Sequence, residues 1–186
     1  MIDVNQLRRG TTYTDDGELL KVINYQHIKT GRGGGTVRVT VRNLRSGSTT
    51  EKTYNTGGRV QDVRLEAVEM EYLFDDGEFL NFMDNETFEQ PQIRKEIFGD
   101  DVYYMKEGTV IKLLRYEGEL IDYELPQTMD FSVVEAENAV AGDTANNPTK
   151  KITTETGLVV TVPMFVKEGD TIRVKTEDGS YQTRVN

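Results

Sequence analysis

A single arginine lies in the most glycine-rich stretch of the chain, "HIKTGRGGGTVRV", which runs from residue 27 to residue 39. Arg32 follows one glycine and precedes three more. A guanidinium group offers five N–H donors in a planar fork, which suits a phosphate or a developing negative charge. At the tip of an exposed hairpin, Arg32 could therefore reach a phosphate or a developing charge that lies away from the rest of the domain. The alternative is a solvated hairpin tip whose glycines only make the turn, and this stretch alone favours that alternative.

Other reactive groups are few. His27 is the only histidine and there is no cysteine, so histidine-based triads, thiolate sites and multi-histidine metal sites are excluded. We expect His27 to be a partly buried strand residue. "GRGGGT" lacks the Lys-Ser/Thr pair of a phosphate-binding loop and leads into a strand. Three acidic pairs could bind a hard cation, but we interpret them as turn residues: Asp15/Asp16, Asp75/Asp76 and Asp100/Asp101. The sequence predicts no catalytic residue, no metal and no cofactor, and hence no enzyme.

The elements that would position Arg32 are predicted to be short strands separated by turns. Apolar or alternating runs such as "LLKVINYQHI" and "GTVRVTVRNL" are typical of strands, and the two flank the glycine run. Along the chain, Lys29, Arg38, Arg42 and Arg45 surround Arg32. An acidic residue followed by glycine recurs between strands and predicts four hairpins, at 15–20, 75–80, 116–121 and 177–182.

Helix is expected to be scarce. One turn is predicted at "NQLRRG", where Asn5 could be the cap, and further helix is predicted within "NETFEQPQI" and "KEIFGDDVYYMKEG". Four hairpins favour several small β-barrels over one sandwich, because a barrel of five or six strands needs only about 60 residues.

Charge divides the 186 residues into three blocks. Residues 1–65 carry a net charge of +5, residues 66–127 carry −12 and residues 128–186 carry −3. This asymmetry suggests a basic end that meets a polyanion, although a solvated surface is an equally good interpretation of charge alone. Without a signal-peptide core, a membrane-length apolar run or cysteine, the chain is expected to be cytoplasmic.

Longer motifs resemble bacterial elongation factor P over the whole chain. They include "YQHIKTGRGGG" with the following "VRVTVRNLRSGSTTEKTYNTG", the central "MEYLFDDGEFLNFMDNETFEQ", and the terminal "TETGLVVTVPMFVKEGDTIRV". The resemblance implies an all-β, L-shaped molecule of three barrels. An SH3-like (KOW-like) domain at 1–65 would precede two OB-fold domains, at 66–127 and 128–186.

The resemblance also implies a function and its residues. Family members bind both ribosomal subunits beside peptidyl-tRNA and relieve stalling at consecutive prolines. Their tip loop reaches the peptidyl-transferase centre and corresponds here to Lys29, Thr30, Gly31, Arg32, Gly33, Gly34 and Gly35. Arg32 replaces the lysine that many members modify, so it is either bare or rhamnosylated by an arginine-modifying enzyme. Gly142, Asp143 and Thr144 match a loop that reads mRNA at the exit site.

Two alternatives remain. The elongation factor P-like paralogue shares the architecture and an "LPQT" like that at 125–128, whereas "GDT" and "VPMFV" favour the factor proper. A generic OB-fold protein would bind single-stranded nucleic acid in a basic groove, but the two OB-type segments here are acidic.

Overall fold

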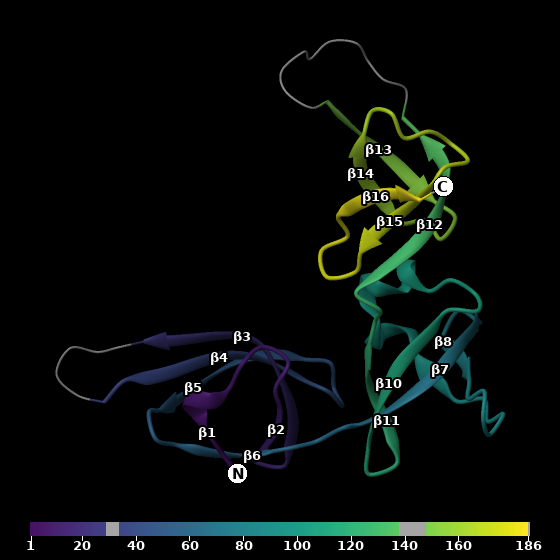
Figure 1. Ribbon diagram of the computed structural model, residues 1–186. Coiled ribbons are helices and arrows are strands. Elements are labelled where there is room, and N and C mark those ends of the chain that lie inside the picture. The colour runs from purple at the N-terminus through teal and green to yellow at the C-terminus, as the bar shows by residue number, and fades with distance from the viewer. Residues whose placement is uncertain (29–33, 138–147, 186) are drawn as a thin grey trace. The chain divides into compact units, whose positions relative to one another are not determined.

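The computed structural model describes residues 1–28, 34–137 and 148–185. Its regular structure is almost entirely β, in three sheets that follow one another along the chain (Figure 1). In these three ranges the helices are short 3-10 turns. The expected all-β architecture is confirmed.

The first sheet has six strands in the order β1-β6-β2-β3-β4-β5. Its long central strands, β3 and β4, run antiparallel and side by side (Figure 1). A bulge between Val22 and Asn24 inserts one extra residue into β3. The strands are β1 (Ile2–Asp3), β2 (Thr12–Asp15), β3 (Glu18–Ile28), β4 (Thr36–Asn43), β5 (Thr49–Asn55) and β6 (Arg59–Asp62).

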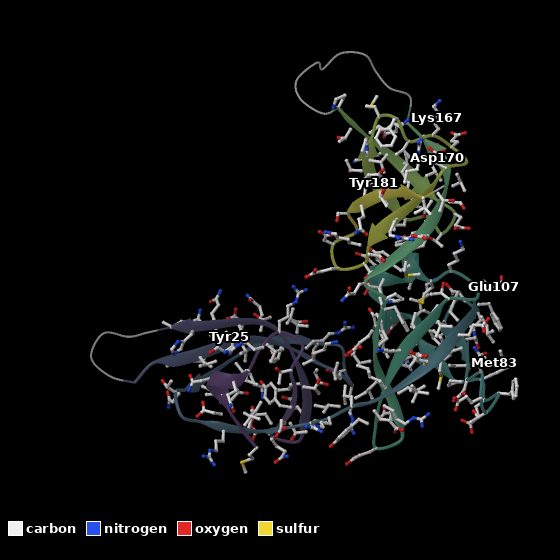
Figure 2. All side chains as sticks on the ribbon, viewed as in Figure 1. Tyr25, Met83, Glu107, Lys167, Asp170 and Tyr181 are labelled. Carbon is white, nitrogen blue, oxygen red and sulfur yellow. The ribbon has the colours of Figure 1, made fainter. Side chains whose placement is uncertain are left out.

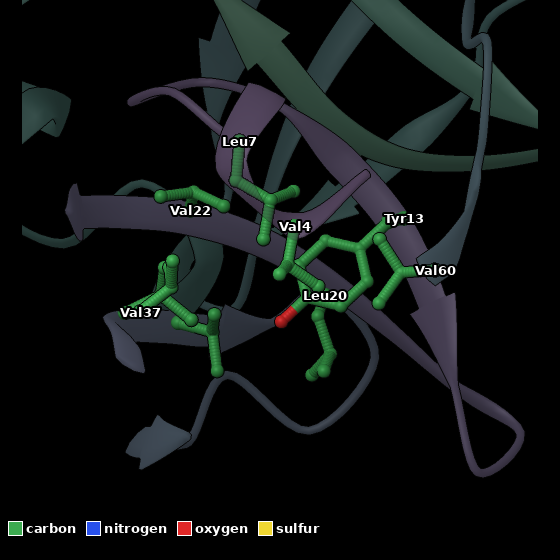
Figure 3. Packing of buried hydrophobic residues seen from close by; sticks show 9 residues of the cluster. Val4, Leu7, Tyr13, Leu20, Val22, Val37 and Val60 are labelled. Atoms are coloured by element: carbon green, nitrogen blue, oxygen red, sulfur yellow. The ribbon is translucent and has the colours of Figure 1, made fainter. Parts of the chain in front are cut away.

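One compact core holds this sheet. Val37, Val39 and Val41 alternate along β4 and are completely buried, because successive strand residues point to opposite faces. Figure 3 shows Val37 packed with residues from β2, β3, β6 and the first 3-10 helix, η1 (Val4–Gln6). The cluster is Val4, Leu7, Tyr13, Leu20, Val22, Val37, Val39, Val41 and Val60.

The second sheet has the order β11-β10-β7-β8-β9. Aromatic rings extend its core: Phe98 stacks on Tyr123 with centroids 4.2 Å apart, and Phe82 lies 5.9 Å from Phe98. The elements are β7 (Glu66–Asp75), β8 (Phe79–Met83), β9 (Gln92–Arg94), η2 (Lys95–Ile97), η3 (Gly99–Tyr104), β10 (Val110–Tyr116) and β11 (Glu119–Glu124).

The third sheet has the order β14-β13-β12-β15-β16 and a core that includes Phe131, Val162 and Ile172. Arg173 donates two hydrogen bonds to the carboxylate of its cross-strand partner, Asp130. The strands are β12 (Thr128–Ala136), β13 (Thr149–Thr154), β14 (Val159–Pro163), β15 (Thr171–Lys175) and β16 (Tyr181–Val185).

The three sheets are distributed over two compact units. One unit comprises Met1–Val68 and Leu113–Asp122, and the other comprises Glu69–Lys112 and Tyr123–Asn186. The end of the β10–β11 hairpin therefore packs with the first sheet. The predicted boundaries, 1–65, 66–127 and 128–186, stay a prediction.

The four predicted hairpins are confirmed. Asp16 and Gly17 both have positive φ in the two-residue turn between β2 and β3, and Glu117 and Gly118 repeat this geometry between β10 and β11. The other two hairpins join β7 to β8 and β15 to β16.

The helix predictions are only partly right. "KEIFGDDVYYMKEG" contains η2 and η3, as 3-10 helices. Asp3, and not Asn5, caps η1, because its carboxylate accepts a hydrogen bond from the backbone N–H of Asn5. The predicted helix in "NETFEQPQI" is wrong, since this segment is a turn followed by β9.

Candidate functional site

The candidate tip loop connects β3 to β4. The two strands pair up to Ile28 and Thr36, so residues 29–35 form the whole connection and Arg32 is central in it. Five of the predicted tip residues lie outside the described residues: Lys29, Thr30, Gly31, Arg32 and Gly33. The structure does describe Gly34, Gly35 and both strands. The structure therefore describes the site at the base of the loop, where β3 ends and β4 begins.

Gly35 closes the base of this loop. Its carbonyl accepts hydrogen bonds from the backbone N–H and the hydroxyl of Thr56, the residue after β5. A Cβ atom at Gly35 would lie 3.2 Å from the carbonyl oxygen of Ile28 and 3.3 Å from Thr56 Oγ1. Both distances are shorter than comfortable packing allows. Gly35 thus allows the end of β3, the start of β4 and the residue after β5 to approach one another closely.

The outward face of β4 carries two of the predicted basic residues. Arg38 and Arg42 alternate with the buried valines, so both point away from the core. Arg38 is paired with Gln26 of β3, and Arg42 with Lys21. These side chains form a polar, basic surface along the hairpin that leads to the tip loop.

The burial expected for His27 is wrong, and Arg45 lies away from the base of the loop. Arg45 follows the far end of β4, a strand that extends roughly 23 Å from Thr36, and its Nε lies 3.7 Å from Glu119 Oε2. Arg45 is close to the tip loop in the sequence but not in the fold, because an extended strand advances about 3.3 Å per residue. His27 is on β3 as predicted but is exposed and not partly buried, although it is opposite the buried Val37, because this pair lies near the end of the hairpin.

A cation–π contact lies on β3, close to the tip loop. The guanidinium carbon of Arg8 lies 5.1 Å from the ring centroid of Tyr25, which Figure 2 labels on β3. Tyr25 is half-buried and packs against the first core. This cation–π contact adds a further positive charge beside the strand that leads to the loop.

The β10–β11 hairpin packs on the opposite end of β3. Ile121 of β11 is buried with Leu19 and Leu44, and Val63, Leu65 and Tyr116 surround them. Lys21 Nζ donates to Asp122 Oδ2 at 2.5 Å, and only 8 % of the Asp122 side chain is exposed. A buried carboxylate therefore fixes the strand whose other end begins the tip loop.

The remaining predicted site lies between β12 and β13. Gly142, Asp143 and Thr144 fall outside the described residues. On the described side, the backbone N–H of Glu137 donates to the carbonyl of Lys151 at 3.1 Å, next to the pairing of Ala136 with Ile152. In the described ranges, no three acidic or histidine side chains form a cluster that could hold a metal. No helix there is long and apolar enough to cross a membrane.

Fold and site define a class: an all-β protein of small barrels in series, with a basic hairpin on the first. Family comparisons make this specific. The elongation factor P KOW-like domain matches residues 3–60, the elongation factor P OB domain matches residues 65–123, and the elongation factor P C-terminal domain matches residues 129–184. The chain belongs to the elongation factor P family, and is thus related to translation elongation factors.

Two solved structures are more distant. Eukaryotic translation initiation factor 5A from Methanococcus jannaschii is 20% identical, with a TM-score of 0.49 over 66% of this chain and 89% of that chain. A translation initiation factor eIF-5A family protein from Naegleria fowleri is 14% identical, with a TM-score of 0.41 over 67% of this chain and 96% of that chain.

Sequence reasoning missed two features of the site. The Gly35–Thr56 contact joins residues 21 positions apart, and the Lys21–Asp122 pair joins residues 101 positions apart. No local pattern marks either pair. The acidic residue in "LIDYEL" offered only a weak signal, as a charge at a position where a strand is expected to be buried.

Proposed function

We propose that this protein binds the ribosome beside peptidyl-tRNA and stimulates peptide-bond formation at consecutive prolines. Proline has a locked ring and no free N–H in a chain, which restricts the geometry of attack. Ordering the CCA end of peptidyl-tRNA lowers the barrier through positioning alone. The protein would contribute no acid, base or cofactor, and the ribosome would remain the enzyme.

The observation that carries this proposal is the anchored base of the β3–β4 loop. The strands pair to within seven residues of each other, and Gly35 is held by Thr56. A loop with a fixed base loses less conformational freedom when its tip binds. Arg38 and Arg42 on the same hairpin would contact RNA phosphates, and Arg32 would be the group presented to the CCA end.

Further parts of the chain complete the proposal. We assign the loop with Gly142, Asp143 and Thr144 to mRNA at the exit site, and the blocks 1–65, 66–127 and 128–186 to separate domains. The site of action would be the cytoplasm. An arginine-modifying enzyme is a further partner if Arg32 carries rhamnose.

Translation of a message with consecutive prolines, using purified components, tests the proposal. Wild-type protein should relieve stalling, and Arg32→Ala should reduce the rate of rescue by roughly tenfold or more while the protein stays folded. Arg45→Ala is the matched control, because Arg45 lies in the same barrel at the far end of β4. Full rescue by Arg32→Ala would reject the tip role.

The state of Arg32 needs a separate measurement. The intact mass of protein purified from its native host distinguishes bare arginine from rhamnosyl-arginine. If stalling persists even with this native protein, the proposed function itself is wrong.

A further inference from the structure

One aromatic side chain outside the candidate site is both strained and exposed. Phe88 lies in the loop between β8 and β9 with 71% of its surface exposed and φ at 60°. Figure 2 labels Met83, the last residue of β8, where this loop begins. Bulky residues rarely adopt positive φ, because the Cβ atom crowds the backbone.

The residue type at position 88 is unusual for the turn that it ends. In the described part of the chain, the other non-glycine residues at positive φ are Asp16 and Glu117, and both are in two-residue hairpin turns that require this conformation. Phe88 instead ends a single turn, at the position where glycine is normally favoured. If only the stability of the fold mattered, glycine would be favoured over phenylalanine at this position.

Asp84 holds the loop in this conformation. Its carbonyl accepts the N–H of Phe88 at 2.8 Å, and its own N–H donates to the carbonyl of Glu89 at 2.9 Å. Its carboxylate accepts the N–H groups of Glu86, at 2.8 Å, and Thr87, at 3.1 Å. These bonds involve the backbone and Asp84 only, so they form with any residue except proline at position 88. They hold the backbone of a residue whose side chain is exposed.

We propose that Phe88 is the anchor of a docking surface for a basic protein. Residues 84–91 contain three acidic residues and no basic one, and Glu86 and Glu89 are exposed beside the ring. These charges repel nucleic-acid phosphates and attract lysine and arginine. An aromatic ring framed by carboxylates matches a pocket lined by apolar and guanidinium groups.

The proposal rests on the proposed function in one respect: the basic protein is taken to be a component of the ribosome. Strain at an exposed aromatic residue persists only where the surrounding structure enforces it, and such sites are concentrated at binding surfaces. Single exposed hydrophobic residues are otherwise common and need no explanation. Phe74 is such a residue, since it is 56% exposed on β7 but has no positive φ.

Three variants of the full-length protein test the proposal. Phe88→Gly removes the ring and the strain together, so its melting temperature should equal or exceed that of the wild type. Phe88→Ala removes the ring alone, and Phe74→Ala is the matched control. Binding to purified ribosomes stalled at a proline codon should weaken by about tenfold or more in both Phe88 variants and stay unchanged in Phe74→Ala.

Crosslinking identifies the partner. A photoreactive benzoyl-phenylalanine at position 88 should crosslink to a ribosomal protein. A crosslink to ribosomal RNA alone, or none on ribosomes that bind the factor, would overturn the proposed partner. Wild-type affinity of both Phe88 variants, or a lower melting temperature of Phe88→Gly, would overturn the docking role while the proposed function stands. Failure of the wild type itself to bind ribosomes would reject both proposals.

Discussion

Gly35 shows how steric crowding at one residue supports the candidate site. The sequence predicted a flexible glycine run, but flexibility does not explain Gly35, whose absent side chain lets the ends of β3 and β5 approach each other. Gly34 differs, because the nearest atom to a Cβ there is Thr56 Oγ1 at 3.9 Å. The sequence could predict the loop but not this difference, since it depends on Thr56, a residue 21 positions away.

We predict that Gly35→Ala destabilises the N-terminal barrel by about 1 kcal/mol, because the added methyl group meets backbone oxygen. Gly34→Ala is the matched control and should leave the free energy of unfolding unchanged or slightly increased. Urea unfolding of both variants measures the effect. Equal stability of the two would show that the base of the loop adjusts without cost.

Asp15 is the last residue of β2, and it forms hydrogen bonds whose strength depends on pH. Partial burial raises its pKa, but hydrogen bonds from Lys52, at 2.9 Å, and the Tyr54 hydroxyl, at 2.8 Å, outweigh this and lower the pKa of Asp15 below its usual 3.8. Because the pKa is lower in the folded state, the ionised carboxylate stabilises the fold above the unfolded value. That stabilisation is lost as the pH falls through the folded value.

Asp15→Asn should therefore be less stable than the wild type at pH 7, by on the order of 1 kcal/mol. The difference should narrow as the pH falls below about 4. Urea unfolding between pH 7 and pH 2.5 measures it, and Asp16→Asn in the adjacent exposed turn is the control. A difference that stays constant with pH would mean that the charge of Asp15 is unimportant.

Among the elements, the hairpin turns were predictable from local chemistry, one predicted helix failed because a competing local turn replaces it, and the docking of β10–β11 was unpredictable because it depends on long-range packing. Asp16-Gly17 and Glu117-Gly118 adopt the positive φ values that their dipeptides favour, whatever surrounds them. The helix expected near Asn85 fails because the carboxylate and backbone of Asp84 close a tight turn instead. The packing of β10–β11 on β3 brings together residues about 100 positions apart, which no periodicity reveals.

The Lys21–Asp122 pair should contribute to the docking of that hairpin beside the hydrophobic contacts of Ile121. Lys21→Met leaves the Asp122 carboxylate nearly buried without its cation, so we predict a loss of about 2 kcal/mol. The double variant with Asp122→Asn should lose less than the sum of the single variants, with a coupling of about 1 kcal/mol. Glu119→Ala, which removes the exposed partner of Arg45, should change stability by less than about 0.5 kcal/mol. Additive effects of the Lys21 and Asp122 changes would contradict the pairing.

For the whole molecule, net charge and charge distribution predict opposite responses to salt. The chain carries −10 overall, yet residues 1–65 carry +5, and Arg38 and Arg42 lie on one face of β4. If net charge governed binding to ribosomes, added salt would screen repulsion from RNA and raise the affinity. If the basic face of β4 governs it, added salt would lower the affinity through release of counterions.

We predict that affinity for ribosomes falls as potassium chloride rises, despite the acidic composition. Arg38→Ala should weaken binding and reduce the slope of log K against log salt by about 1, because one phosphate contact is lost. Arg45→Ala should leave the slope unchanged, since Arg45 lies beyond the far end of β4 near Glu119. Binding measured over a series of salt concentrations separates the two cases. An affinity that rises with salt would mean that the acidic residues after position 65, and not the basic hairpin, control the approach to the ribosome.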